Sequence, residues 1–405
     1  MNINQFFSKI KEEEVRNSSF LHLTANEPVM SQTARSFMSS KLADRYFMGA
    51  GVDGKVDLGP LTALGFPGVA ELVEAAENAA KEMLGAQIVN LSCLSGVHAM
   101  MCAILSTTEP GDVVMTVHHD HGGHFATQGI LDRVGRKHVF AEYDFKTLSF
   151  DTEKLAQKYQ ESGAKAFYMD VSYYVNPHNL REIREALGAE AIIIYDASHT
   201  MGLIMGQTFQ DPFVEGADVI CANTHKTLPG PHKGMIAFKN AKLGEKANDI
   251  IDDCLYSTPQ LHHMIALATT ILEMKEFGQA YAQQVIINSN ALGTALSKRG
   301  MEVRNANTGR YSENHQVHLL SKKIGDYRDL YDRLHKNNIT SNFDNVFDTG
   351  MFLRIGTQEV TRRGMKETEM QQIAAFIDRA FKGELFSDEV ARFVSKFQKV
   401  EYSFD

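Results

Sequence analysis

Cysteine is scarce in this sequence, and no two cysteines form a CxxC pair. The four are Cys93, Cys102, Cys221 and Cys254, and each lies in an apolar stretch. Such cysteines are typical of reduced thiols in a protein core, whereas disulfide frameworks and zinc sites have characteristic paired spacings. We therefore expect a cytoplasmic protein without a metal site.

Long apolar runs and blocks of positive charge are missing as well. No run approaches the roughly 18 apolar residues that span a membrane, and residues 1–17 are charged and lack the apolar core of a secretory signal. The formal net charge of −9 comes without any basic cluster, which argues against a nucleic-acid partner. These absences predict a soluble protein that binds neither membranes nor nucleic acids.

The length of 405 residues exceeds what one ordinary hydrophobic core can hold. We predict three parts: an N-terminal arm at residues 1–45, a large domain at 46–255, and an interdomain helix with a small C-terminal domain at 256–405. Residues 49–68 are rich in glycine and proline, which predicts a long irregular loop.

Short apolar strands alternate with helical patterns through the large domain. The strands are predicted at 87–92, 112–117, 166–171, 191–196, 217–222 and 235–238, and helices at 69–84, 97–107 and 181–187. This alternation indicates an α/β fold with a mostly parallel central sheet. Beyond residue 250, a long helical region at 260–299, strands at 301–305, 315–320 and 348–356, and a helix at 366–381 predict a smaller α+β domain.

Polar and titratable residues follow five of the predicted strands. In chain order they are Ser95 and Gly96, His121 and His124, Ser172 and Tyr173, Asp196 and His199, and His225 and Lys226. Ligands of parallel α/β sheets bind at the carboxyl ends of the strands. We therefore expect these side chains to share one site, close to the junction of the two domains.

Lys226 stands in a bend between two apolar strands, where a lysine head group is costly to desolvate unless it reaches solvent. Binding of pyridoxal phosphate (PLP) would explain a lysine at this position. The lysine amine can form a Schiff base with the cofactor aldehyde, and an aspartate such as Asp196 can pair with the pyridine nitrogen. A helix N-terminus preceded by Ser-Gly can hold the phosphate, and an imidazole can stack on the ring.

Five segments together resemble one family of PLP enzymes. They are SGVHAM (95–100), HGGHFATQG (121–129), DASHTMGL (196–203), THKTLPGPHKG (224–234) and MFLRIGTQEVTRRGMKE (351–367). The chain resembles the serine hydroxymethyltransferase family from about Leu21 to Ala380. The resemblance implies the PLP-dependent transferase fold type I and a homodimer whose subunits share active sites.

The resemblance also implies roles for individual residues. The residues expected to be catalytic are Lys226, His124, Tyr46 and His225. The residues expected to bind the cofactor are Ser95, Gly96, Val97, His124, Ser172, Asp196, His199, Lys226, Ser257 and Thr258. The residues expected to bind the substrate are Asn26, Tyr46 and Arg354, of which Arg354 would clamp the carboxylate of a small amino acid. No residue is implied as a metal ligand.

One departure from the family concerns the reaction itself. Met48 stands where the family has the glutamate of a Y-x-E-G segment, which serves as acid and base in the chemistry with tetrahydrofolate. A thioether cannot transfer a proton. We therefore hypothesise folate-independent aldol-type chemistry: an aldolase or transaldolase acting on serine, threonine or a related β-hydroxy amino acid, with an aldehyde as acceptor in the second case.

Three alternatives stay open at this point. The protein could be a tetrahydrofolate-dependent serine hydroxymethyltransferase with a relocated acid/base group. It could catalyse another PLP reaction, such as transamination, decarboxylation, racemisation or condensation, because the scaffold does not fix which bond at Cα is broken. It could be a non-catalytic binding subunit, although the presence of Lys226 and Asp196 argues against this.

Overall fold

The central element is a seven-stranded sheet. The computed structural model of the chain describes residues 2–57, 59–320, 327–346 and 350–405. The strand order is β4 (Ile88–Asn90), β12 (Pro229–Phe238), β11 (Val219–His225), β10 (Ile192–Asp196), β9 (Ala166–Met169), β5 (Val113–Val117) and β6 (Lys137–Ala141). The strands from β11 to β6 are parallel to their neighbours, and β12 is antiparallel to both β11 and β4. The predicted α/β fold with a mostly parallel sheet is confirmed, and all six expected strands are present.

Both faces of this sheet are covered by helices. In β10, Ile193 and Tyr195 belong to one core and Ile194 to the other. A strand that is buried on both sides reads as a continuous apolar run, which is why the sequence revealed it. β6 escaped prediction because it is an edge strand whose side chains are mostly exposed or half-buried.

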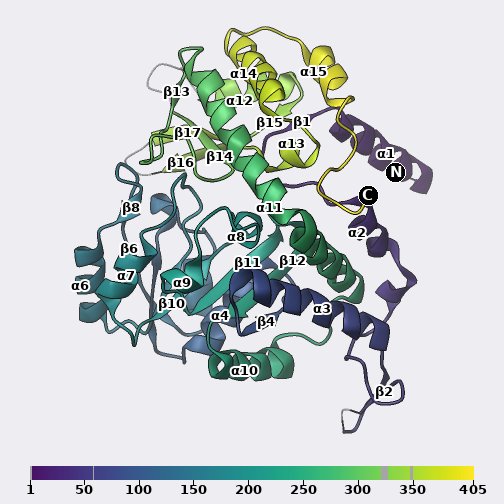
Figure 1. Ribbon diagram of the computed structural model, residues 1–405, viewed down its shortest axis with the longest axis vertical. Helices are drawn as coiled ribbons and strands as arrows, with labels where there is room; N and C mark the ends of the chain where they lie inside the picture. The colour runs from purple at the N-terminus through teal and green to yellow at the C-terminus, as the bar shows by residue number, and fades with distance from the viewer. Residues whose placement is uncertain (1, 58, 321–326, 347–349) are drawn as a thin grey trace.

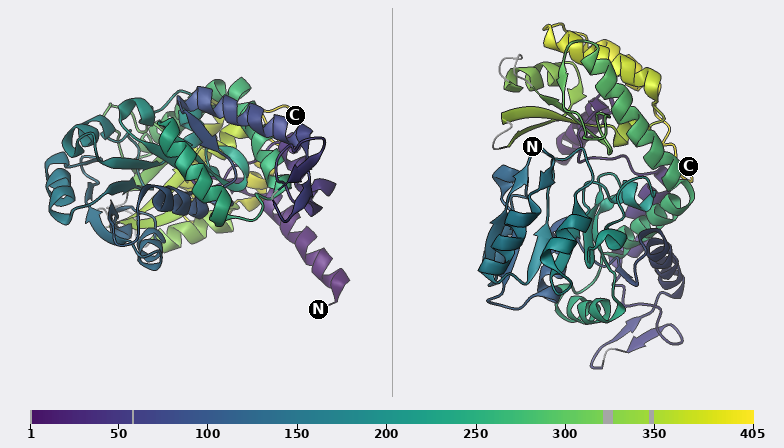
Figure 2. Two further views of the ribbon diagram at one scale, coloured as in Figure 1. Left: turned by 90° about the horizontal axis from the view of Figure 1, so that it is seen from below. Right: turned by 60° about the vertical axis from the view of Figure 1, so that its left-hand side comes forward.

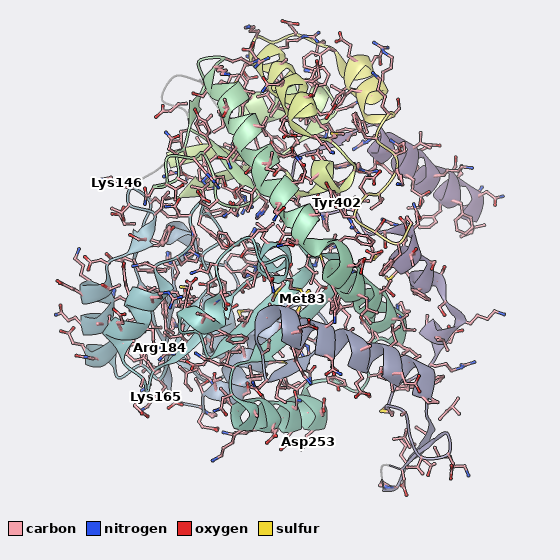
Figure 3. The ribbon with its side chains drawn as sticks, in the orientation of Figure 1. Met83, Lys146, Lys165, Arg184, Asp253 and Tyr402 are labelled. Atoms are coloured by element: carbon pink, nitrogen blue, oxygen red, sulfur yellow. The ribbon has the colours of Figure 1, made fainter. Side chains whose placement is uncertain are left out.

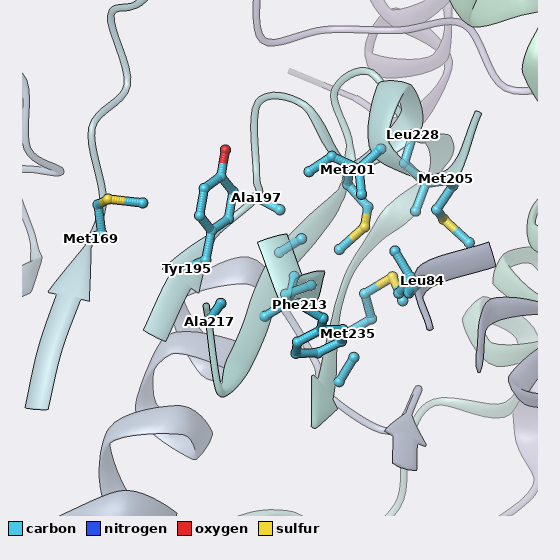
Figure 4. Close-up of a cluster of buried hydrophobic side chains, with 14 of the residues drawn as sticks. Leu84, Met169, Tyr195, Ala197, Met201, Met205, Phe213, Ala217, Leu228 and Met235 are labelled. Atoms are coloured by element: carbon cyan, nitrogen blue, oxygen red, sulfur yellow. The ribbon is translucent and has the colours of Figure 1, made fainter. Parts of the chain in front are cut away.

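The first face is covered by α3 (Pro67–Leu84), α6 (Thr152–Ser162), α7 (Leu180–Leu187), α8 (Met201–Met205), α9 (Pro212–Glu215) and the first half of α11 (Leu261–Ser297). Figure 4 shows part of this core, where Met201 and Met205 of α8 lie near Leu84 and Met235. The second face is covered by α4 (Gly96–Thr107), α5 (Thr127–Arg133) and α10 (Ala241–Ile250), which is followed by a π-helical turn at Ile251–Leu255.

A second hydrophobic core lies in the C-terminal part of the chain. Its antiparallel sheet has the order β13 (Glu302–Val303), β14 (Gln316–Leu320), β17 (Gly350–Gly356) and β16 (Asn342–Val346). Around it lie α12 (Tyr327–Lys336), α13 (Gln358–Arg362), α14 (Glu367–Phe381) and α15 (Ser387–Val394). Asp348 and Thr349, which open the strand predicted at 348–356, lie outside the described residues.

Helix α11 joins the two cores, as Figure 1 shows. Its 37 residues contribute Met264 and Leu267 to the first core and Leu292 and Leu296 to the second. The N-terminal segment also joins the second core, because β1 (Leu21–His22) pairs in parallel with β15 (Ile339–Thr340). The domain boundaries at residues 45 and 255 remain a prediction.

The N-terminal helix and one hairpin project from the body of the molecule (Figure 2). Helix α1 (Ile3–Ser18) is capped by Asn2 and buries none of its residues, and the short α2 (Gln32–Ser36) follows it. Residues 49–68 are not wholly irregular as predicted: β2 (Lys55–Asp57) pairs with β3 (Thr62–Leu64). The glycine-rich surroundings hid this short alternation. A second small hairpin joins β7 (Tyr143–Asp144) and β8 (Ser149–Phe150).

Charged side chains such as Lys146, Lys165 and Asp253 lie at the periphery (Figure 3). Within the described ranges, no helix has the length and apolar character needed to cross a membrane. All four cysteines are free thiols. Cys254 corrects one expectation, because it is exposed in the π-helical turn rather than packed in the core.

Candidate active site

A cavity of about 290 Å³ lies at the carboxyl ends of the central strands. It is lined by ten of the residues predicted for the site: Asn26, Ser95, Gly96, Val97, His124, Ser172, Asp196, His199, His225 and Lys226. These residues come from segments as far apart in sequence as 26 and 226. Parallel packing of the strands therefore brings together the side chains that follow them.

Lys226 occupies the turn between β11 and β12 and points into the cavity. Its Nζ lies 3.2 Å from Nε2 of His199. The turn is fixed because the Thr227 hydroxyl donates to the His199 carbonyl at 2.8 Å, and the Tyr281 hydroxyl donates to the Thr227 carbonyl at 3.0 Å. Burial lowers the pKa of Lys226 to about 8, although the Asp196 charge opposes the shift. The neutral, nucleophilic form of this amine is therefore far more populated near neutral pH than it is in an ordinary lysine.

Asp196 ends β10 and presents its carboxyl to the cavity. One oxygen accepts the hydroxyl proton of Tyr168, and the other accepts the Ser198 N–H at 2.8 Å. The Cys221 thiol donates to the Tyr168 oxygen at 3.8 Å. This arrangement fixes a carboxyl at the floor of the cavity, where it could pair with a protonated ring nitrogen.

The N-terminus of α4 also lines the cavity. Ser95 is the N-cap, and its hydroxyl accepts the His98 N–H at 3.1 Å. Gly96 has no room for a side chain, since a Cβ there would lie 2.7 Å from the Cβ of Asn223. Val97 follows on the first turn and is 40% exposed. Free backbone N–H groups and the helix dipole make such an end suitable for a phosphate.

Three histidines line the cavity as neutral rings. Burial is the largest cause that lowers the pKa of His124, of His199 and of His225, the last to about 3. Nδ1 of His124 accepts the Ala126 N–H at 3.3 Å, so the proton of its neutral ring resides on Nε2. Nδ1 of His199 and Nδ1 of His225 are buried without a hydrogen-bond partner.

Arg354 lies on β17 of the C-terminal sheet, next to the cavity but not among the residues that line it. Its Nη1 donates to the Ser172 carbonyl at 3.2 Å, and its guanidinium lies 4.7 Å from the centre of the Tyr173 ring. Nε lies 3.0 Å from Oδ2 of Asp344, an ion pair without hydrogen-bond geometry. No sequence pattern pointed to Asp344, and the predicted role of Arg354 as a carboxylate clamp stays a prediction.

Tyr46, Ser257 and Thr258 lie away from the cavity. The Tyr46 side chain is 61% exposed. The Phe47 N–H donates to the Thr258 hydroxyl at 3.3 Å, so the two segments lie side by side. Within one chain these residues therefore form a separate group near the surface.

Sequence reasoning missed six residues that line the cavity: Met100, Tyr168, Asp170, Val171, Ser198 and Asn223. Asp170 was the most accessible to prediction, because it follows β9 just as Asp196 ends β10. It lies within the strand predicted at 166–171. Tyr168 carries no such signal, since an aromatic residue within a buried strand is typical of a core.

A metal is not favoured at the one buried cysteine–histidine cluster found among the described residues. Cys93, His98 and Cys102 have donor atoms within 4.8 Å of one another. However, both ring nitrogens of His98 are already engaged: Nδ1 accepts the Leu94 N–H at 2.9 Å, and Nε2 lies 2.9 Å from the Leu255 carbonyl. This leaves the imidazole without a free lone pair for a metal.

The polar atoms of the cavity fit a bound cofactor. Four buried atoms on its wall have no partner within the protein: Oδ1 of Asn26, Oδ1 of Asn223, Nδ1 of His199 and Nδ1 of His225. Buried polar atoms nearly always have a partner, so this concentration points to a ligand with several polar groups. The lysine, the aspartate and the helix N-terminus are the set that PLP requires.

Comparisons with known proteins agree with this fit. The family model described as serine hydroxymethyltransferase matches residues 2–377. A serine hydroxymethyltransferase of Methanocella arvoryzae is 35% identical over 402 residues, covering 95% of this chain and 92% of that protein. A fluorothreonine transaldolase of Streptantibioticus cattleyicolor is 32% identical over 404 residues, and the match covers 98% of this chain and 63% of that protein.

A solved structure is similar over the whole chain. It is the L-threonine transaldolase from Pseudomonas fluorescens, crystallised in its internal aldimine state. It superposes with a TM-score of 0.89 at 28% identity, covering 100% of this chain and 94% of that one.

Proposed function

The chain belongs to the serine hydroxymethyltransferase family, and we propose that within it the protein is a folate-independent aldol-type enzyme, a transaldolase or aldolase of serine, threonine or a related β-hydroxy amino acid. As a member of that family it is a PLP-dependent enzyme of fold type I. What the proposal adds is the bond that is broken, the substrate class and the independence from folate.

The observation that carries the proposal is Met48. A thioether stands at the position of the family's folate-linked glutamate and can neither donate nor accept a proton. Within one chain, the carboxyl groups among the described residues that line the cavity are those of Asp170 and Asp196. Both belong to ends of the central strands, and Asp196 is assigned to the pyridine nitrogen. Aldol chemistry at the Cα–Cβ bond does not require a folate-linked group.

The residues of this chain would divide the work as follows. Lys226 would hold PLP covalently, Asp196 would pair with its ring nitrogen, and Ser95 and Gly96 would bind its phosphate. His124 would lie against the ring. Bound PLP supplies the electron sink that accepts the pair left when a bond to Cα breaks. Asn26 and Arg354 would bind the substrate carboxylate.

A proton must also move. During cleavage the Cα–Cβ bond breaks, the β-hydroxyl loses its proton and an aldehyde leaves. During addition Cα bonds to the carbonyl carbon of a second aldehyde, whose oxygen takes up a proton. Nδ1 of His225 and Nδ1 of His199 are both buried and unpartnered in neutral rings, and we assign the acceptor to His225, for which the family resemblance implies a catalytic role. His124 does not offer one, since its Nδ1 already accepts a backbone N–H.

The relatives named transaldolases support exchange of one aldehyde for another. A second candidate is a tetrahydrofolate-dependent serine hydroxymethyltransferase with a relocated acid/base group. It is favoured by the 35% identity to proteins with that name. The two candidates differ in one requirement, which is folate.

The deciding experiment uses the PLP-loaded protein with L-threonine or L-serine, an aromatic aldehyde as acceptor, and tetrahydrofolate either present or absent. Released acetaldehyde is measured by coupled oxidation of NADH, and new β-hydroxy amino acids by chromatography. The proposal expects both products from L-threonine at the same rate with and without folate. Conversion of L-serine to glycine only when folate is added, with no product from L-threonine, would establish the second candidate instead.

A homodimer with shared active sites forms part of the proposal. Tyr46, Ser257 and Thr258 cannot serve the cavity of their own chain from where they lie, yet they form one group near the surface. Helix α1 exposes apolar side chains, including Ile3, Phe7 and Val15, each more than 60% exposed. A second copy of the chain would cover such surfaces and bring Tyr46 to the partner's cavity. The cytoplasm is the proposed location, because free thiols are typical of a reducing compartment.

Complementation tests the shared site directly. Lys226→Ala and Tyr46→Ala homodimers are each expected to be inactive or strongly impaired. After unfolding and refolding together, a mixed dimer would contain one complete site, which yields up to about a quarter of wild-type activity for random pairing. No recovery, with mixed dimers confirmed by mass spectrometry, would place Tyr46 outside the shared site.

A further inference from the structure

Two carboxyl groups, one buried and one half-buried, lie side by side at the cavity, and the proposed reaction uses only the half-buried one. Asp196 ends β10, and Asp170 directly follows β9. These strands pair in parallel with Tyr195 opposite Met169, so the next residues along each strand are Asp196 and Asp170. Both line the cavity, and Asp170 is only 2% exposed.

Asp170 binds three segments that surround the cavity. Its Oδ2 accepts the backbone N–H of His124 at 3.1 Å and the Thr127 hydroxyl of α5 at 2.6 Å. Its Oδ1 accepts the Thr116 hydroxyl of β5 at 3.2 Å. The neighbouring Gly123 is equally constrained, because a Cβ there would lie 2.0 Å from the Val117 carbonyl oxygen.

We propose that Asp170 is a positioning residue: it holds the main chain at His124 so that this imidazole faces the cofactor site. The proposal rests on the proposed function, which assigns His124 to the cofactor ring. Without Asp170, the N–H of His124 and the hydroxyl of Thr127 would lose a buried acceptor. The segment that carries His124 would then be free to move away from the cavity wall.

The same contacts serve the carboxyl in both of its protonation states. Oδ2 can accept from His124 and Thr127 whether or not Asp170 is ionised. Oδ1 accepts from Thr116 when it is ionised, and a proton on Oδ1 can be donated to the Thr116 oxygen instead. Asp170 can therefore change its charge without losing a hydrogen bond.

The charge of Asp170 depends on its surroundings. Burial, reinforced by the Asp196 charge, raises its pKa to about 7, although the hydrogen bonds from Thr127, His124 and Thr116 favour the ionised form. The other titratable groups around it are Asp196 of β10, Tyr168 of β9, Cys221 of β11, the His124 imidazole and, beyond Asp196, Lys226. The cavity thus gains a negative charge as the pH rises through about 7.

Two variants separate positioning from bulk and charge. In Asp170→Asn, the amide oxygen can accept from His124 and Thr127 while the NH₂ group donates to Thr116, so the contacts survive and the charge is lost. In Asp170→Ala, the contacts are lost. Thr127→Val removes a single donor from the same oxygen with little change of shape, and it serves as the second variant if Asp170→Ala does not fold.

The first measurement is amide hydrogen exchange of the peptide that contains His124, in the protein without cofactor. We expect about tenfold faster exchange in Asp170→Ala, a smaller increase in Thr127→Val, and a wild-type rate in Asp170→Asn. The second is the dissociation constant of PLP, which should rise about tenfold or more in Asp170→Ala and stay close to wild type in Asp170→Asn. Unchanged exchange in both Asp170→Ala and Thr127→Val, or equal defects in Asp170→Asn and Asp170→Ala, would overturn the proposal.

These readouts are independent of the reaction. If the protein proves not to be an aldol-type enzyme, but exchange at His124 still depends on Asp170, the proposed function fails and the positioning role stands. If the aldol reaction is found but amide hydrogen exchange at His124 does not change in the Asp170 variants, the positioning role is refuted and the proposed function stands.

Discussion

The buried ion pair between Arg362 and Glu273 should be one of the most sensitive points of the fold. Nη2 of Arg362 lies 2.7 Å from Oε2 of Glu273, and both side chains are 1% exposed. Arg362 also donates from Nη1 to the carbonyls of Glu401 and Tyr402, and the Phe404 N–H donates to Oε1 of Glu273 at 3.2 Å. The pair thereby joins α13, α11 and the C-terminal segment, where Figure 3 labels Tyr402.

Replacing Arg362 by methionine would leave the Glu273 carboxylate buried without its counter-charge. Breaking such a pair from one side costs about 3–5 kcal/mol. For a chain of this length the entropy of unfolding is about 0.85 kcal/mol/K, so Tm should fall by about 4 to 6 °C. The double variant Arg362→Met with Glu273→Leu removes both charges, and it should recover about half of the loss or more.

Urea unfolding followed by far-ultraviolet circular dichroism is the suitable assay, since the sequence has no tryptophan to report by fluorescence. The two single variants and the double variant form a double-mutant cycle. A loss below about 1 kcal/mol in Arg362→Met, the size of an exposed pair, would refute this reasoning. So would a double variant that is as unstable as the sum of the two single variants.

Three further predictions concern the cavity and its surroundings. Gly96→Ala should weaken PLP binding by about 1–3 kcal/mol because the new Cβ overlaps Asn223. The control Gly68→Ala, which has open space around it, should leave the dissociation constant of PLP unchanged, and equal effects of the two variants would contradict the close contact between Gly96 and Asn223. The rate at which the cofactor-free protein takes up PLP, measured by stopped-flow absorbance, should rise with pH and level off above about pH 8, because burial lowers the pKa of Lys226. A rate that continues to rise up to pH 10 would indicate that Lys226 has the pKa of an ordinary lysine. Burial also lowers the pKa of Lys233 to about 8, so between about pH 8 and 10 the unfolded chain binds one proton more than the folded chain, and the folded state gains stability as the pH rises. The urea midpoint of the wild type should therefore rise relative to that of Lys233→Met between pH 7.5 and 9.5. A constant difference between the two midpoints would argue against a buried charge.

Much of the fold could be predicted because its signals are local. A strand buried on both faces must be apolar at every position, as β10 is, and a helix that joins two cores must repeat its apolar residues along 37 positions, as α11 does. The elements that escaped prediction lack such signals. β6 lies at an edge of the sheet, and the hairpin of β2 and β3 is mostly exposed, so neither shows a run of buried side chains.

The candidate site was predictable to the extent that it follows one rule, that polar side chains gather where parallel strands end. That rule located Lys226, Asp196 and the Ser95–Gly96 turn. It missed Asp170 because the strand was predicted to continue past Met169. It could not locate Asp344, whose ion pair with Arg354 depends on how β16 and β17 lie against each other.

The sequence by itself determined the α/β alternation, the family and the set of chemical groups, since these depend on neighbouring residues and short motifs. Only the tertiary structure decided which of those groups meet. Asp170 binds the main chain 46 positions away, Arg354 reaches Ser172 across 182 positions, and Phe47 binds Thr258 across 211. Contacts of this span arise when whole layers pack together, and no local pattern encodes the resulting distances.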